Sequence, residues 1–174
     1  MSKQRKWQVI SLTYSSNQSQ KDNSANAQLF KKIIMDHYRN PRNKGLVEDD
    51  EYVTIFLRNP SCGDDLTVQV KANGDKIESI RQYGTGCSIC CSSASMMSEL
   101  LASKTLTEAA QLINQFYLMV EAKPYDEEAL GDAISLQGVA KLPQRIKCAT
   151  LGWKACEEAL GKIQEEQADD SASK

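Results

Sequence analysis

The order of apolar patterns along the chain predicts an α+β domain, in which a small three-stranded antiparallel sheet packs against helices. Helical spacing comes first, three alternating segments follow it, and helical spacing then returns. The chain has 174 residues, of which 41% are hydrophobic and 25% are charged. This composition is typical of one globular domain with polar ends, and not of a disordered chain.

The first helical segment places Leu29, Ile33 and His37 on one face. Because the residue before a proline avoids the helical conformation, we expect this helix to end before Pro41. Residues 1–27 are rich in Ser, Asn, Gln and Lys and show no sustained period. They are predicted to form a polar, flexible N-terminal extension.

Three strand-like segments follow at residues 53–57, 66–70 and 76–83, each with apolar residues at alternating positions. Asn73 and Gly74 form a strong hairpin signal between the second and third segments. Connections this short join antiparallel neighbours, so the three segments are predicted to form an antiparallel meander.

Helical spacing returns at residues 90–102 and 106–120. Thr105 and Thr107 are both candidates for the N-cap of the second of these helices, because a threonine hydroxyl can accept a hydrogen bond from a free backbone N–H. Together with the strands, these helices complete the predicted core of the domain.

The remaining C-terminal part is less regular. Residues 123–138 contain scattered glycines and are expected to be loose, and a last helix is predicted at about residues 143–163. The domain is accordingly predicted to span residues 28–163, with a flexible acidic tail at residues 164–174.

Composition excludes several classes of function. The 21 Lys and Arg residues against 23 Asp and Glu residues give a net charge of -2, so nothing favours nucleic acid as the main partner. No apolar run approaches the length of a membrane span, and the mean hydropathy is -0.48. A single histidine excludes a histidine-rich metal centre. The opening residues do not resemble a secretory signal, and we expect a cytoplasmic protein.

The six cysteines carry the strongest chemical signal in the chain. In a reducing cytoplasm, clustered cysteines indicate metal or sulfur chemistry more often than disulfides. They occur at Cys62, Cys87, Cys90, Cys91, Cys148 and Cys156.

Three of these cysteines lie in settings that favour a reactive or metal-binding thiolate. Cys62 and Asp64 flank Gly63, which permits a bend through which thiolate and carboxylate can converge. Cys87 opens a helix, where free N–H groups lower the pKa of a thiol. Cys148 follows two nearby basic residues, Arg145 and Lys147, which also favour the thiolate.

Three thiolates and one carboxylate can form a tetrahedral zinc site with a formal charge of -2, which Arg145 or Lys147 could offset. Spacing alone does not establish this set, and any single cysteine could be a small core residue. We prefer that interpretation for Cys156. A redox CxxC at residues 87–90 is a weaker alternative, and His37 is interpreted as packing or capping locally.

Taken together, five segments closely resemble the SufU family, the zinc-containing branch of the IscU-like iron–sulfur assembly proteins. Three separated cysteine motifs in the right order make this resemblance specific. The segments are LFKKIIMDHYRNPRNKG (29–45), NPSCGD (59–64), GTGCSI (84–89), SASMMSELL (93–101) and LPQRIKCATLGW (142–153).

The resemblance implies an IscU/SufU-like fold and a Zn²⁺ site. Its implied metal ligands are Cys62, Asp64, Cys87 and Cys148. Lys147 stands where IscU proteins carry a histidine, which favours the SufU branch.

The chain also departs from the SufU pattern. Cys90 replaces a usual serine and Cys91 is atypical, so these thiols could compete for metal, accept sulfur or simply fill the sites of small residues. We favour the last of these interpretations.

The resemblance also implies an activity, that of a zinc-dependent sulfurtransferase. The protein would take persulfide sulfur from a SufS-type pyridoxal-phosphate cysteine desulfurase and deliver it to other iron–sulfur assembly proteins. Cys62 is the predicted acceptor because its loop is flexible, and Arg145 is predicted to pair with Asp64 in support. The alternatives are a scaffold that builds a [2Fe–2S] cluster, formed transiently on the same cysteines, and a purely structural zinc module.

Overall fold

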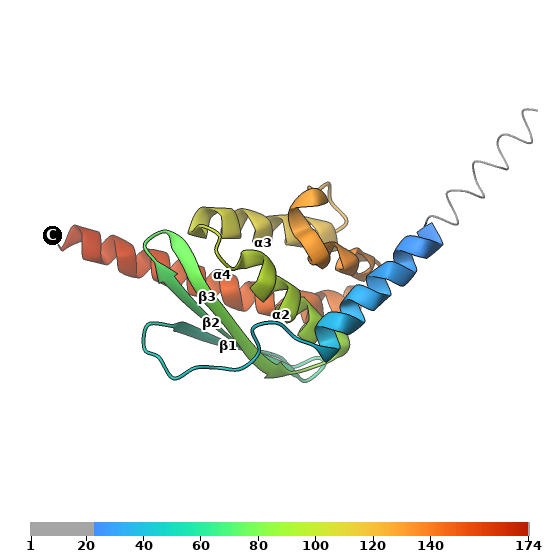
Figure 1. Cartoon of the computed structure of the whole chain (residues 1–174), viewed down its shortest axis with the longest axis horizontal. Helices are drawn as coiled ribbons and strands as arrows, with labels where there is room; N and C mark the ends of the chain where they lie inside the picture. Colours follow the sequence, from blue (N-terminus) through green and yellow to red (C-terminus); the bar gives the residue numbers. More distant parts are fainter. Residues whose placement is uncertain (1–22, 174) are drawn as a thin grey trace, which may run out of the picture.

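The computed structural model describes residues 23–173 of the chain. A helix at residues 23–39 leads into a three-stranded antiparallel sheet of order β1-β2-β3, and helical elements make up the rest (Figure 1). The elements are β1 (Val53–Asn59), β2 (Asp64–Asn73), β3 (Lys76–Thr85), α2 (Ser88–Leu101), α3 (Leu106–Val120), η1 (Glu128–Lys141) and α4 (Pro143–Ala172). The predicted α+β class and the antiparallel meander are confirmed.

The first hairpin places the turn that carries Cys62 at one end of the sheet. Its antiparallel register pairs Asn59 with Asp64, so residues 60–63 form the turn between β1 and β2. Gly63 has a φ of 72°, a left-handed conformation that glycine adopts without steric cost. The same end of the sheet receives the start of α2, because β3 ends at Thr85 and α2 begins at Ser88.

Helices α2 and α4 pack against the sheet, with α4 on β1 and β2 and α2 on β3 (Figure 1). Trp153 of α4 is fully buried, and its ring stacks on Phe116 of α3 with the centroids 4.0 Å apart. Its indole N–H donates to Ser93 Oγ of α2 at 2.9 Å. A stacked aromatic pair adds about 1 kcal/mol beyond its buried area, and here it fixes α4, the helix that carries Cys148.

Helix α3 agrees with the sequence analysis. It spans the predicted residues 106–120, and Thr105 is its N-cap. The Thr105 hydroxyl accepts from the Glu108 N–H at 3.1 Å, and the Glu108 carboxylate accepts from the Thr105 N–H at 2.8 Å. This reciprocal pair is a capping box, which satisfies two backbone donors that a helix start leaves free.

Three parts of the secondary structure differ from expectation. Helix α4 continues to Ala172 and not to residue 163, because the acidic end is rich in Glu, Gln and Ala and contains no helix breaker. The stretch expected to be loose forms η1, a 3₁₀ helix kinked at Gly131, whose φ is 50°. The N-terminal helix begins by residue 23, inside the segment predicted as an extension, and residues 1–22 lie outside the described part.

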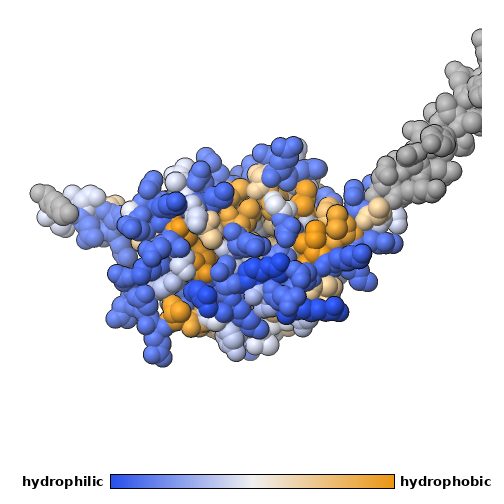
Figure 2. Space-filling view, in the orientation of Figure 1, coloured by the Kyte–Doolittle hydropathy of each residue, from blue (hydrophilic) through white to orange (hydrophobic). Residues whose placement is uncertain are grey.

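Most of the surface facing the viewer in Figure 2 is hydrophilic, and hydrophobic side chains gather between the N-terminal helix and η1. A hollow there is lined by apolar residues that include Phe30, Ile34, Met35 and Ile89. None of the helices within residues 23–173 combines the length and the apolar character needed to cross a bilayer.

Candidate metal centre

Cys62 lies exposed on the turn between β1 and β2, and Asn59 organises that turn. The Asn59 side-chain oxygen accepts from the Ser61 N–H at 3.2 Å, and its carbonyl accepts from the Gly63 N–H at 3.0 Å. The Asn59 amide nitrogen then donates to Cys62 Sγ at 2.9 Å. Asn59 therefore both shapes the turn and contacts the thiol that the turn presents.

Asp64, the first residue of β2, is buried between the turn and the start of α2. Cys62 Sγ donates to its Oδ2 at 2.7 Å, and the Cys87 N–H donates to its Oδ1 at 3.0 Å. Burial raises the pKa of Asp64, but hydrogen bonds from Cys62, Cys148 and the Cys87 N–H, together with the charge of Arg145, outweigh burial and lower it overall. The carboxylate is therefore ionised at neutral pH.

The glycine before Cys87 is required by this carboxylate. A Cβ at Gly86 would lie 2.9 Å from Asp64 Oδ1 and 3.1 Å from the Cβ of Cys90. Any side chain at this position would push Asp64 away from the helix start. Close packing against Asp64 therefore requires a glycine at position 86.

Cys148 lies in the second turn of α4 and is buried, with its Sγ 3.2 Å from Cys62 Sγ. Burial raises the pKa of the Cys148 thiol, and its contacts with Asp64 and Cys62 raise it further. Arg145 does interact with Cys148, as expected, but burial and the neighbouring Asp64 and Cys62 outweigh its effect. Negative groups packed this closely need either a proton or a cation.

Arg145, half-buried one turn before Cys148, supplies one positive charge. Its hydrogen bond to Cys148 and the negative charges of Cys87 and Cys148 raise its pKa, and it also hydrogen-bonds to Cys87. The guanidinium therefore interacts with both thiols, and its charge also lowers the pKa of Asp64. Lys147 is exposed.

Ligand atoms of Cys62, Asp64 and Cys148 all lie within 4.8 Å of one another. The structure therefore brings three of the four predicted ligands to one point. The Cys87 thiol lies outside this group, although its backbone N–H holds Asp64 and Arg145 links it to Cys148.

The other cysteines are not among the three clustered ligands. Cys90 and Cys156 are buried in the core, and burial raises the pKa of Cys156 to about 12. Cys91 is half-buried, and its thiol donates to the Gly86 carbonyl at 3.5 Å. All six cysteines, each within the described residues, are free thiols.

One residue with a clear role in the site is missing from the sequence-based prediction. The Asn59 amide contacts Cys62 Sγ and also reaches Cys148 Sγ at 3.9 Å. The asparagine that opens the NPSCGD segment is typical of a turn that hydrogen-bonds to its own side chain. Its amide also lies next to both thiols, which is a consequence of where α4 packs.

The donor set fits zinc. Sulfur and oxygen ligands together suit a borderline-soft cation, and three ligands already converge within ligand–ligand contact. A doubly charged cation would also offset the burial and the negative neighbours that raise the pKa of Cys148. Cys62, Asp64 and Cys148 would hold it, and Cys87 would be the fourth ligand.

Comparison with known proteins places this geometry in a family. Residues 29–170 match the NifU-like N terminal domain. The chain is 44% identical over 135 residues to the zinc-dependent sulfurtransferase SufU of Bacillus subtilis (strain 168), covering 77% of this chain and 90% of that protein. It is 42% identical over 134 residues to the iron–sulfur cluster assembly scaffold protein IscU of Streptococcus pyogenes serotype M1, covering 76% and 82%.

A solved structure supports the same assignment at the level of fold. The N-terminal NifU-like protein of Brucella abortus superposes with a TM-score of 0.71, covering 77% of this chain and 93% of that one. At 20% identity this likeness shows the fold alone. With its match over residues 29–170 and its three-stranded sheet backed by helices, the chain belongs to the NifU-like N-terminal domain family.

Proposed function

We propose that this protein is a zinc-dependent sulfur acceptor in iron–sulfur cluster assembly, which takes persulfide sulfur from a pyridoxal-phosphate cysteine desulfurase. One observation carries the proposal: an exposed thiol, Cys62, lies 3.2 Å from the buried thiol of Cys148 and 2.7 Å from the Asp64 carboxylate. The family and the SufU relative support it. Because the chemistry needs reduced thiols, we place the protein in the cytoplasm.

Zinc bound by Cys62, Asp64, Cys87 and Cys148 would keep the thiols deprotonated at neutral pH and restrain their reactivity. The protein's own groups supply the rest. The Asn59 amide donates to Cys62 Sγ, which stabilises negative charge on that sulfur. Arg145 balances the charge of Cys87 and Cys148.

Sulfur transfer is a thiol exchange. The Cys62 thiolate attacks the outer sulfur of the desulfurase persulfide, a new S–S bond forms at Cys62, and the bond to the desulfurase cysteine breaks. The desulfurase leaves with a thiolate, and Cys62 carries the persulfide. Among the three clustered ligands, Cys62 is the one exposed to a partner, whereas Asp64 and Cys148 are buried.

The test is desulfurase turnover measured with the Cys62→Ala variant at one zinc per chain. We expect stimulation of the desulfurase to be lost, because no acceptor thiolate reaches the partner. Cys156→Ala is the matched control, since it removes a thiol of the core and leaves the turn intact. Full stimulation by Cys62→Ala would disprove the assignment of the acceptor.

A second candidate function is a scaffold that assembles a [2Fe–2S] cluster on the same cysteines. The IscU relative at 42% identity favours it. The two functions differ in colour: a zinc protein is colourless, whereas a cluster absorbs visible light. Visible absorbance of the protein as purified, combined with metal analysis, separates them.

A further inference from the structure

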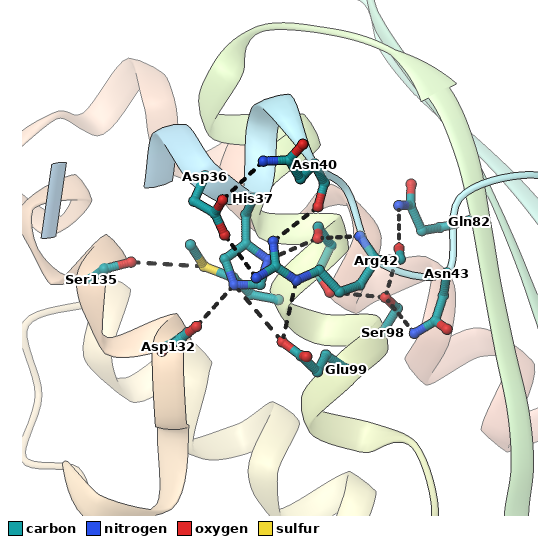
Figure 3. Close-up of polar contacts among 12 residues, drawn as sticks. Asp36, His37, Asn40, Arg42, Asn43, Gln82, Ser98, Glu99, Asp132 and Ser135 are labelled. Carbon is teal, nitrogen blue, oxygen red and sulfur yellow. Dashed lines mark hydrogen bonds and ion pairs between the residues drawn. The ribbon is translucent and has the colours of Figure 1, made fainter. Parts of the chain in front are cut away.

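The only histidine of the chain is fully buried, and both of its ring nitrogens have partners on other elements. His37 Nδ1 lies 2.8 Å from Ser95 Oγ on α2. His37 Nε2 lies 3.0 Å from Asp132 Oδ2 on η1 and 3.9 Å from Glu99 Oε2 on α2. Figure 3 shows the imidazole directed at these two carboxylates, which reach it from different elements.

Two local features bring these side chains together. Ser95 and Glu99 are one turn apart on α2, so they face the same side of that helix. Asp132 follows Gly131, whose φ of 50° and ψ of -134° kink η1. Glycine tolerates this conformation, and the kink turns the chain so that Asp132 reaches His37.

Ser95 fixes the ring without fixing which nitrogen is protonated. Its hydroxyl oxygen accepts from the Arg42 N–H at 2.8 Å. The same hydroxyl can donate to Nδ1 or accept from an Nδ1–H, because its hydrogen rotates freely. The Nε2 lone pair can therefore be directed at the carboxylates without loss of the contact to Ser95.

The surrounding charges are unbalanced. Arg42 Nη2 is 2.7 Å from Asp36 Oδ2, whereas Arg42 Nε is 3.9 Å from Glu99 Oε2. The guanidinium is thus committed mainly to Asp36, and the carboxylates of Glu99 and Asp132 share little positive charge. Around the imidazole, the three carboxylates and one guanidinium leave two net negative charges, and Lys104 lines the same hollow as Glu99 and Asp132.

The cluster is also accessible. The side chains of Glu99 and Asp132 are 54% and 51% exposed, whereas that of His37 is 0% exposed. An open hollow of about 420 Å³ is lined by both carboxylates and by Lys104. A small ion could therefore reach both carboxylates from solvent, and these two groups lie against the buried Nε2.

We propose that His37, Glu99 and Asp132 form a second metal site, for a divalent first-row transition ion with nitrogen and oxygen ligands. Their ligand atoms lie within 4.8 Å of one another. Ligands about 2.1 Å from a tetrahedral ion lie about 3.4 Å apart, and the observed 3.0 and 3.9 Å lie on either side of that value. The ion binds Nε2, and Nδ1–H donates to Ser95, the usual second contact of a metal-bound histidine.

This site is independent of the cysteine centre, because it shares no ligand with it and uses no sulfur. Its effect would be to join the N-terminal helix, α2 and η1 through one ion. Two carboxylates and a neutral imidazole around a divalent cation give a site without net charge, which lowers the cost of partial burial.

The test uses full-length protein already loaded with one zinc per chain. A second equivalent of Zn²⁺ is added while the ¹⁵N resonances of the imidazole are followed, and the single histidine makes their assignment unambiguous. We expect the Nε2 resonance to shift and to saturate at one further ion per chain, with Nδ1 remaining protonated.

The test variant is Glu99→Gln/Asp132→Asn, which keeps side-chain size and removes both charges. Asp49→Asn/Glu51→Gln is the matched control, because it removes two carboxylates that face Lys71 and no histidine. We expect zinc binding at His37 to weaken at least roughly tenfold in the test variant and to remain within about twofold in the control.

Two results would overturn the proposal. One is an Nε2 resonance that does not respond to the second equivalent of zinc. The other is an equal loss of the response in both double variants, which would show general attraction to acidic groups. Neither result depends on sulfur transfer, so the second site and the proposed function can fail separately.

Discussion

The cysteines of this protein occupy two regions that give the same side chain opposite chemistry. At the end of the sheet, Cys62 and Cys148 meet beside a carboxylate, an amide and a guanidinium. In the core, Cys156 is buried among apolar side chains, and Cys90 is buried at the border of the first region, where the charge of Asp64 adds to burial in raising its pKa. A thiol in the first region can lose its proton when it binds a cation. A thiol in the second region keeps its proton and acts as a small apolar residue.

The strongest test of this comparison exchanges one cysteine from each region. Cys148→Ser should weaken zinc binding at least roughly tenfold, because a serine hydroxyl stays protonated at neutral pH and is a poor zinc ligand. Cys156→Ser should leave zinc binding unchanged and lower only the free energy of unfolding, by about 1–3 kcal/mol for a buried hydroxyl. Competition with a chromophoric chelator measures both affinities. Equal zinc affinities in the two variants would contradict the division into regions.

A smaller effect is expected at Asn59, which contacts the thiols without binding the ion. Asn59→Ala removes the donor to Cys62 Sγ and the side-chain acceptor of the turn. Zinc affinity should fall by roughly tenfold, the usual effect of losing a group that supports a ligand. Asn40→Ala is the control, because that amide pairs with Asp36 on the exposed N-terminal helix. A loss no larger than that of the control would assign Asn59 to turn geometry alone.

The buried thiol of Cys156 should make the free energy of unfolding depend on pH. Burial raises the pKa of Cys156 from 9.0 to about 12, so the folded state holds a proton that the unfolded state releases above pH 9. This contribution is complete below pH 9 and is lost as pH rises toward 12, at about 1.4 kcal/mol per pH unit. Urea unfolding between pH 8.5 and 10.5 should show a flatter slope for Cys156→Ala than for the native chain.

Cys90, which is also buried with a raised pKa, acts in the same direction. The slope of Cys156→Ala should therefore be reduced and not abolished. Identical slopes for the variant and the native chain would mean that folding does not raise the pKa of the Cys156 thiol.

The smallest effect is expected at Cys91, in the first turn of α2. It is half-buried, and its thiol donates to the Gly86 carbonyl. If it only fills space, Cys91→Ser should change zinc affinity by less than about twofold, since serine makes the same donation. A larger loss of zinc affinity, measured by the same chelator competition, would show that Cys91 takes part in the metal site.

Local sequence signals predicted most of the secondary structure. The alternating segments, the Asn73-Gly74 turn and the Thr105 cap each depend on neighbours close in the chain, and all three were found. The acidic end extends the last helix beyond its predicted end at residue 163. Its Glu, Gln and Ala residues favour a helix, and Gln167 also donates to the Gly74 carbonyl at 2.6 Å.

The candidate site divides in the same way. Cys62 and Asp64 are two residues apart on a hairpin turn, so their convergence follows from local geometry. The role of Asn59 toward Cys148 spans 89 positions and depends on the packing of α4. The environment of His37 likewise depends on α2 and η1, and no local pattern indicated it.

By itself, the sequence determined which residue types are available and where the chain bends: thiols after glycine-containing turns, a carboxylate two positions from one of them, and a single histidine on a helix face. Only the tertiary structure decided which of the groups that lie far apart in the chain meet. Contacts across 86 and 95 positions arise from the packing of whole helices against a sheet, and that packing is fixed by the sum of many apolar contacts and by no single motif.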